Sequence, residues 1–246
     1  MDKAIYIGVS GATEAMAAQT VHANNLANAS TTGFRADLVQ AQAVQVEGQG
    51  AETRFANQLL GSATDFSQGP MIQTGNETDL AIAGDGFIAV QAPDGSEAYT
   101  RAGDLQLSAF GELMTGNGLP VLGNGGPIAI PPNQKIEIGS DGTISVLEQG
   151  QGAEAITAFD RIKLVNPNIE ELEKGADGLV RLKEGGVALA DAEVRVQAGF
   201  IENSNVNVVD AMVEMISLTR RYEMNVKLIQ TAEQNSEVSA RLLQVR

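Results

Sequence analysis

Residues 23 to 35 read Ala-Asn-Asn-Leu-Ala-Asn-Ala-Ser-Thr-Thr-Gly-Phe-Arg, and they end a helical pattern that begins near the N-terminus. Leu26 continues an apolar seam. Asn24, Asn25 and Asn28 place three side-chain amides on the last turns, where each offers donors and acceptors to neighbouring backbone groups. The amides therefore predict an Asn-capped helix C-terminus.

The residues that follow the last Asn change the direction of the chain. Gly33 supplies a backbone that can turn with positive φ, and Phe34 is a large apolar anchor directly after it. Taken alone, the stretch predicts no more than the end of a helix and a turn. What it means depends on the remainder of the chain.

Upstream of this stretch, residues 3–28 predict a helix whose apolar positions alternate in spacing between three and four, as in a heptad repeat. The seam is narrow and rich in small residues, so that two helices could approach closely along it. A helix with so thin a stripe needs a partner for stability. The seam consists of Ile5, Val9, Ala12, Met16, Gln19, Ala23 and Leu26.

The C-terminal residues predict a second and longer helix. Asn207 with Asp210 three residues later resembles a capping box, and no Gly or Pro occurs after Gly199. Such a helix is longer than a compact domain usually needs. Its heptad positions are Met212, Met215, Thr219, Tyr222, Val226, Ile229, Glu233, Ser236, Ala240 and Leu243.

Between the helices the pattern is mostly that of β-strands. Residues 36–76 are rich in Gly and predict an extended connector or a loose hairpin. From residue 77 to 201, short apolar runs alternate with turn signals such as Asp94-Gly95 and Asp141-Gly142. This central part predicts a meander, sandwich or small barrel that is large enough to bury its own core.

The net charge of −15 is concentrated in the middle of the chain. Residues 1–40 carry two bases against three acids, and residues 202–246 carry five bases against six acids, so each end has a charge of −1 and the centre −13. The acidic centre disfavours a nucleic-acid partner, because phosphate binding needs clustered Lys and Arg. The neutral ends can pack against copies of themselves without strong repulsion.

The sequence contains no recognisable catalytic or metal-binding pattern. The chain has no Cys and one His, His22, so neither a thiolate site nor a conventional imidazole metal site is expected. No phosphate-binding loop or nucleophile elbow occurs, and Glu170, Glu171 and Glu173 are better explained as a solvated acidic face. We expect no enzyme activity, no cofactor and no metal, and the absence of a long apolar run predicts no membrane insertion.

The order of motifs resembles the bacterial flagellar rod and hook proteins. Asn-Asn-x-Ala-Asn followed by Gly33-Phe-Arg35 matches the N-terminal signature of that family. Gly69-Pro-Met-Ile-Gln-Thr-Gly75 and Tyr99-Thr-Arg-Ala-Gly-Asp-Leu105 look like its β-domain, and Ser204-Asn-Val-Asn207 begins its C-terminal signature. These matches occur in the family's order over nearly the whole chain, and within the family they are most similar to the proximal rod subtype, with the distal rod as the alternative.

The resemblance implies a non-catalytic, axial component of the flagellar basal body that assembles helically into a drive shaft and export channel. Its implied partners are copies of itself, other rod proteins in a helical stack and, during secretion, the flagellar export apparatus. Family members are exported without a cleavable signal peptide, and this sequence begins without the pattern of one. The implied location is the rod, which spans the periplasm.

The expected fold class is therefore α+β. The N- and C-terminal helices are expected to pair as an antiparallel coiled coil, and an all-β central domain lies between them in the sequence. The expected divisions are 1–35, 36–76, 77–201 and 202–246. A surface β-domain binding module on a coiled-coil stalk remains a competing interpretation. The residues expected at subunit interfaces are Ile5, Val9, Asn24, Asn25, Leu26, Asn28, Gly33, Phe34, Asn205, Met212, Met215, Tyr222, Val226 and Ile229.

Overall fold

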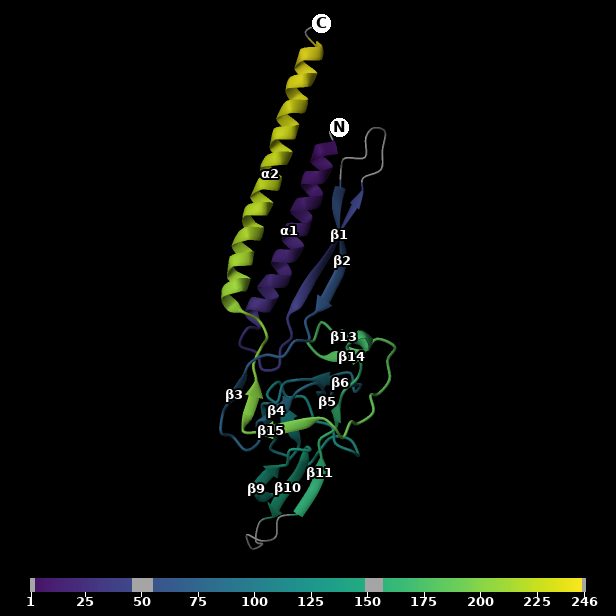
Figure 1. Ribbon diagram of the computed structural model, residues 1–246, viewed down its shortest axis with the longest axis vertical. Helices are drawn as coiled ribbons and strands as arrows, with labels where there is room; N and C mark the ends of the chain where they lie inside the picture. Colours follow the sequence, from purple (N-terminus) through teal and green to yellow (C-terminus); the bar gives the residue numbers. More distant parts are fainter. Residues whose placement is uncertain (1–2, 46–54, 149–156, 245–246) are drawn as a thin grey trace. The chain divides into compact units, whose positions relative to one another are not determined.

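A computed structural model describes residues 3–45, 55–148 and 157–244. The protein is α+β, with one helix at each end of the chain and a β-rich region between them (Figure 1). It divides into two compact units. Unit 1 comprises residues 1–28, 36–65 and 206–246, and unit 2 comprises residues 29–35 and 66–205.

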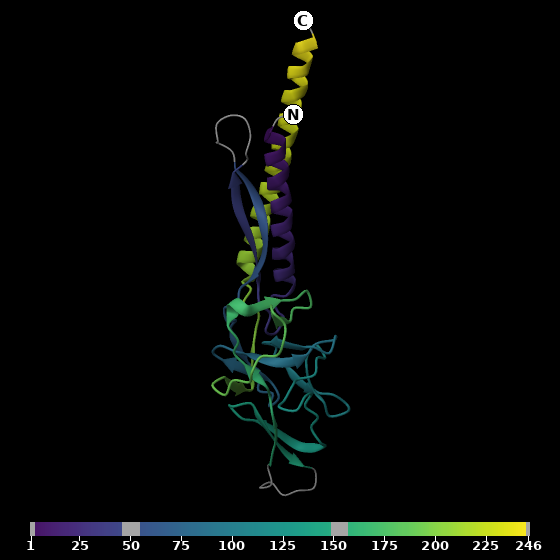
Figure 2. The ribbon, with the colours of Figure 1, turned by 90° about the vertical axis from the view of Figure 1, so that its right-hand side faces the viewer.

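Unit 1 contains both helices and a β-hairpin. Helix α1 (Lys3–Ala27) and helix α2 (Val208–Gln244) lie side by side (Figures 1 and 2). Strands β1 (Asp37–Gln45) and β2 (Phe55–Thr64) pair antiparallel with a register shift between Gln40 and Ala41, and both contact α1. Within the 36–76 segment, β1 and β2 form a hairpin, whereas Met71–Gln73 pairs with Phe200–Glu202 in unit 2.

The start of α2 is capped much as its sequence predicts. Asn207 Oδ1 accepts hydrogen bonds from the backbone N–H groups of Val209 (3.0 Å) and Asp210 (3.4 Å), which satisfies donors that the first turn leaves unpaired. Asp210 does not play the part that the usual capping box gives to the third residue, which accepts from the backbone N–H of the cap. Its carboxylate accepts from the Asn207 side chain at 2.7 Å and thereby fixes the orientation of the capping amide.

Helices α1 and α2 meet along a seam of small residues that is not the one expected from the sequence. The expected seam contained Val9 and Met16, but their side chains are 48% and 55% exposed. The buried positions of α1 are one residue away, at Gly8, Ala15, Ala18 and Asn25. Both stripes have the same spacing, so periodicity alone could not distinguish them.

The buried positions of α2 show the same preference for small residues. They are Ala211, Leu218 and Ala232. A Cβ atom on Gly8 would lie 2.8 Å from Cγ1 of Ile229, and one on Gly11 would lie 2.9 Å from Nδ2 of Asn225. The backbones therefore approach closely where α1 has glycine.

Unit 2 is built from antiparallel strand pairs. The largest sheet has the order β12-β5-β6-β14-β13, and a second sheet has the order β11-β10-β9. The remaining pairs are β15 with β4, β16 with β3, and β7 with β8. The bounds are β3 Met71–Gln73, β4 Leu80–Ala83, β5 Phe87–Gln91, β6 Glu97–Thr100, β7 Leu105–Leu107, β8 Leu113–Thr115, β9 Asn133–Ile138, β10 Thr143–Glu148, β11 Thr157–Arg161, β12 Leu164–Val165, β13 Leu172–Lys174, β14 Val180–Leu182, β15 Arg195–Ala198 and β16 Phe200–Glu202.

Local turn chemistry places several of these strands. Gly95, in the Asp94-Gly95 turn, has a φ of +83° and donates its N–H to Ala92 O, which closes the β5–β6 hairpin. Asp141-Gly142 closes β9 and β10 in the same way. Between β12 and β13, Asn168 caps one short 3₁₀ turn, Ile169–Glu171.

The core of unit 2 consists of large aliphatic side chains. Leu80, Ile88, Leu113 and Ile144 have almost no exposed surface, and they belong to a single contiguous cluster. A second cluster surrounds Tyr99. Burial of this many aliphatic groups is the dominant favourable term in folding, so unit 2 has the interior of an independently stable domain.

Candidate functional site: the polar cluster around Glu202 and the faces of the terminal helices

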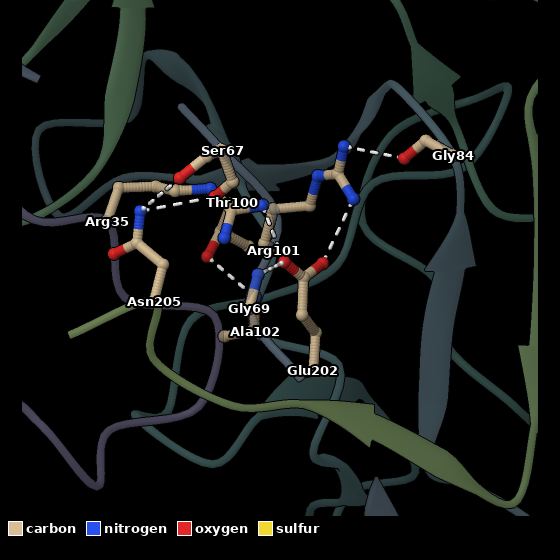
Figure 3. A network of polar contacts seen from close by, with 9 residues as sticks. All are labelled: Arg35, Ser67, Gly69, Gly84, Thr100, Arg101, Ala102, Glu202 and Asn205. Atoms are coloured by element: carbon tan, nitrogen blue, oxygen red, sulfur yellow. Dashed lines mark hydrogen bonds and ion pairs between the residues drawn. The ribbon is translucent and has the colours of Figure 1, made fainter. Parts of the chain in front are cut away.

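A buried carboxylate, Glu202, lies at the end of β16, five residues before the cap of α2. Its Oε2 is 2.9 Å from Nη1 of Arg101, and its Oε1 is 2.6 Å from Nη2 of Arg35. Both guanidinium groups are almost completely buried. Figure 3 shows Glu202 between these groups and the backbone of Gly69, whose N–H donates to Oε1 at 2.9 Å.

The cluster joins segments that are distant in the sequence. Arg101 Nη2 donates to the carbonyl of Gly84 at 2.8 Å, and Asn205 Nδ2 donates to Ser67 at 3.1 Å (Figure 3). The backbone carbonyl of Glu202 also accepts from Gly33 N–H at 2.8 Å. Glu202 thus connects the N-terminal and C-terminal ends of unit 2 within one hydrogen-bonded group.

Glu202 is the main negative charge that acts on Arg101, and Asp85 adds a smaller effect in the same direction. Burial lowers the pKa of Arg101, and the negative charge of Glu202 opposes that shift. Among the residues that the structure describes, Nε and Nη1 of Arg35 and Nε of Arg101 have no hydrogen-bond partner. A buried charge without a partner is costly, so removal of Glu202 would leave two arginines uncompensated.

Three of the interface residues expected from the sequence lie at this cluster. Gly33 bonds to Glu202, Phe34 lies beneath the ammonium group of Lys174 with Nζ 4.0 Å from the ring centroid, and Asn205 bonds to Ser67. Their contacts within the chain do not depend on a neighbouring subunit.

The Asn residues at the end of α1 differ from one another. Asn25 is buried, donating from Nδ2 to the carbonyl of Asp37 at 2.8 Å and accepting from Asp37 N–H at 2.9 Å. Asn28 donates to the carbonyl of Asn24 at 3.0 Å and so satisfies a terminal acceptor of the helix. Asn24 is exposed.

The other expected interface residues lie on α1 and α2. Val9, Met212 and Tyr222 are exposed, whereas Ile229 packs against Gly8 in the seam. The partly buried members are Ile5, Leu26, Met215 and Val226.

Sequence reasoning missed the charged residues of the cluster. Arg35 and Arg101 lay within motifs already quoted, but they were not selected as site residues. The one sequence signal for Glu202 was weak: it is a charged residue directly after the apolar pair Phe200-Ile201. Lys174 gave no signal.

Among the described residues, no group of three or more His, Asp or Glu side chains is arranged to hold a metal ion. Within the same ranges, neither helix has a stretch long and apolar enough to cross a membrane.

Comparison with known proteins places these features in one family. Residues 5–35 match the model of the flagella basal body rod protein, residues 81–146 that of the flagellar hook protein FlgE/F/G D1 domain, and residues 197–242 that of the flagellar basal body rod FlgEFG protein C-terminal.

Similar proteins match over nearly their whole length. Flagellar basal-body rod protein FlgF of Escherichia coli is 43% identical over 99% of both chains, and FlgF of Salmonella typhimurium is 40% identical over the same share. Flagellar basal-body rod protein FlgG of Bacillus subtilis is 34% identical over 95% of this chain and 96% of its own.

Proposed function

This chain belongs to the family of flagellar basal-body rod proteins and is a structural subunit of the proximal rod, and we propose that its helices α1 and α2 form its assembly surface. Members of this family are structural proteins and not enzymes. The subunit assembles with other flagellar rod proteins, and the similarity over the full chain does not favour the stalked binding module.

The observation that carries this proposal is the distribution of large apolar side chains on the helices. Small residues and Leu218 account for the buried positions of the seam, while the large apolar side chains of Val209, Met212, Ile216 and Met224 on α2 are exposed. Exposed apolar surface of this kind marks a contact site, because water leaves it when a partner binds. We assign these faces to neighbouring subunits in a helical stack.

The proposed pairing of α1 with α2 is an antiparallel coiled coil. Its support is the order of neighbours, since Gly8 approaches Ile229 while Gly11 approaches Asn225, so that residue numbers rise in one helix as they fall in the other. The coiled-coil pair, formed by the helical parts of the expected 1–35 and 202–246 divisions, is then the building block of the inner tube, and the acidic 77–201 region is the outer layer.

The β1–β2 hairpin adds a third wall to this building block. A groove of about 730 Å³ lies between α1, β1 and α2, with Ala15 and Ala18 on one side and Leu218 on another. Its lining combines apolar side chains with charged ones such as Glu214 and Arg221, and its size suits a side chain or short segment from a neighbouring subunit. Export through the flagellar apparatus without a cleaved signal belongs to the same proposal.

Substitutions on the helices test whether assembly and folding are separate. Val226→Asp and Asn28→Ala are expected to abolish rod assembly and motility when they replace the wild-type chain in a deletion strain. Amide hydrogen exchange in β5 should remain as slow as in the wild type, because β5 belongs to unit 2.

Gln230→Asp adds the same charge as Val226→Asp at an exposed polar position of α2 and serves as the control. It should assemble normally. If Val226→Asp speeds exchange in β5, or if Gln230→Asp stops assembly equally, the helices do not carry a separate, apolar assembly function.

A further inference from the structure

Residues 29–35, here called the strap, occupy an unusual place in the chain. They belong to unit 2, yet the residues before them (through Asn28) and after them (from Ala36) belong to unit 1. The strap contains turns and a bend but no helix or strand. Sheet pairing therefore does not hold it in unit 2, and specific contacts must do so.

Three consecutive strap residues each make a chemically different contact. Gly33 has a φ of +67° and lies so near the backbone of Arg101 and Ala102 that a Cβ atom would be 2.2 Å from the carbonyl carbon of Arg101. Phe34 receives the ammonium group of Lys174 over its ring. Arg35 pairs with Glu202.

The partners of the strap are held in place by contacts that do not involve it. Arg101 and Gly69 both bind the Glu202 carboxylate, and β16 pairs with β3. Lys174 lies on β13, which pairs with β14. In addition to this pairing, Lys174 contacts the strap itself, since its Nζ donates to the carbonyl of Arg35 at 2.7 Å. The receiving surface is thus preorganised by unit 2 itself.

We propose that unit 2 carries a peptide-binding site for the tripeptide Gly-Phe-Arg, which the chain's own strap fills. The site recognises the absence of a side chain at Gly33, an aromatic ring at Phe34 and a guanidinium at Arg35. These are the features by which a peptide ligand is recognised, namely a close backbone approach, a cation–π contact and a buried ion pair.

The first test uses trypsin on the full chain, because trypsin cleaves after Arg35 only when that residue is accessible. Arg35 is buried in the docked strap, so cleavage there should be slow in the wild type. Gly33→Ala forces a methyl group against the backbone of Arg101 and should raise the rate of cleavage after Arg35 at least tenfold, measured by mass spectrometry of the N-terminal fragment.

Gly75→Ala is the matched control. Gly75 also has a positive φ (+77°), but a Cβ atom there would meet nothing within 4 Å. It therefore introduces similar backbone strain without blocking the strap, and cleavage after Arg35 should stay slow. Lys174→Met, which removes the contacts to Phe34 and to the Arg35 carbonyl, should raise the rate by a smaller factor.

The second test supplies the ligand in trans. A fluorescent peptide of residues 29–35 should bind the Gly33→Ala chain saturably and with 1:1 stoichiometry, as measured by anisotropy, because the strap site of that chain is vacant. The wild-type chain should not bind it, since its site is filled, and a peptide carrying Arg35→Gln should bind neither.

The rate of amide exchange in β5 shows whether the strap behaves as a separable ligand or as a part of the core of unit 2. Unchanged protection of β5 in the Gly33→Ala chain, together with peptide binding, supports a separable site. Loss of that protection would show that the strap is part of the fold of unit 2 and would overturn the proposal. Wild-type cleavage rates in both Gly33→Ala and Lys174→Met would also overturn it.

Discussion

Unit 1 and unit 2 differ in where most of their large apolar side chains lie, although unit 2 also exposes Phe110 (92%) and Leu189 (90%). In unit 2, Ile88 lies in the core and is 0% exposed, whereas in unit 1 Ile216 lies on α2 and is 56% exposed. The buried seam of the helices uses mostly small residues such as glycine and alanine, together with Leu218. Unit 2 thus buries most of its large aliphatic side chains in a core, while α2 leaves several exposed, and these are the side chains of the proposed assembly surface.

Replacing one isoleucine in each unit gives the largest contrast. Ile88→Ala should lower the free energy of unfolding of unit 2 by about 2–5 kcal/mol, because it removes buried methyl groups and leaves a cavity. Ile216→Ala should change stability by no more than about 0.5 kcal/mol, as is usual for an exposed position. Hydrogen exchange measures both values, and swimming of complemented deletion strains measures assembly.

The expected pattern is a stable Ile216→Ala protein that assembles poorly and an Ile88→Ala protein with a loosened core. Comparable losses of stability from the two substitutions would contradict the contrast between the units. Normal swimming with Ile216→Ala would remove that residue from the assembly surface.

A substitution in the small-residue seam should have a smaller effect that stays within unit 1. Gly8→Leu overpacks the contact with Ile229 and should lower the stability of α1 by about 1–3 kcal/mol, seen as faster exchange of its amides. Thr13→Leu places the same side chain on an exposed position of α1 and should cost much less. Equal effects of the two would mean that the seam does not require small residues.

Alkaline pH should affect unit 2 through Tyr99, with the smallest of these effects. Burial raises the pKa of Tyr99 to about 12, with Glu97 adding to the shift and the N–H of Ala188 opposing it. The unfolded chain releases the Tyr99 proton near pH 10. The contribution of Tyr99 to the stability of unit 2 is therefore complete below that pH and is lost as the pH rises to about 12.

Tyr99→Phe should remove this part of the pH dependence, which denaturant unfolding at pH 9 to 12 would show. Tyr222→Phe on α2 is the control, because its ring is partly exposed and lies outside unit 2. An unaltered pH profile in Tyr99→Phe would exclude Tyr99 as the source.

Local features of the fold could be predicted from the sequence because their causes are local. The bounds of α1 and the Asn207 cap of α2 follow from side chains within a few residues, as do the turns at Gly95 and Gly142. The family followed from motifs in order along the chain.

The buried face of each helix could not be chosen from the sequence, because neighbouring stripes have the same three-and-four spacing. Large apolar residues such as Val9 and Met16 suggested the wrong seam between α1 and α2. In an ordinary globular protein such residues face the interior, but in a subunit of an assembly they can face other chains.

The cluster at Glu202 was unpredictable for a different reason. Arg35, Arg101 and Glu202 are far apart in sequence, and only the completed fold of unit 2 brings them together. Gly33 was correctly expected to supply a positive φ. Its reason, close approach to the backbone of Arg101, is a tertiary contact that no local pattern contains.

The paired hydrogen bonds of Asn25 have a consequence for aggregation. A strand at the edge of a sheet offers free N–H and C=O groups to any other strand, and proteins must guard such edges. By bonding both backbone groups of Asp37, the Asn25 amide closes the edge of β1 at its first residue. A strand of another chain therefore cannot pair with Asp37, which protects this end of the hairpin from edge-to-edge aggregation before the rod is assembled.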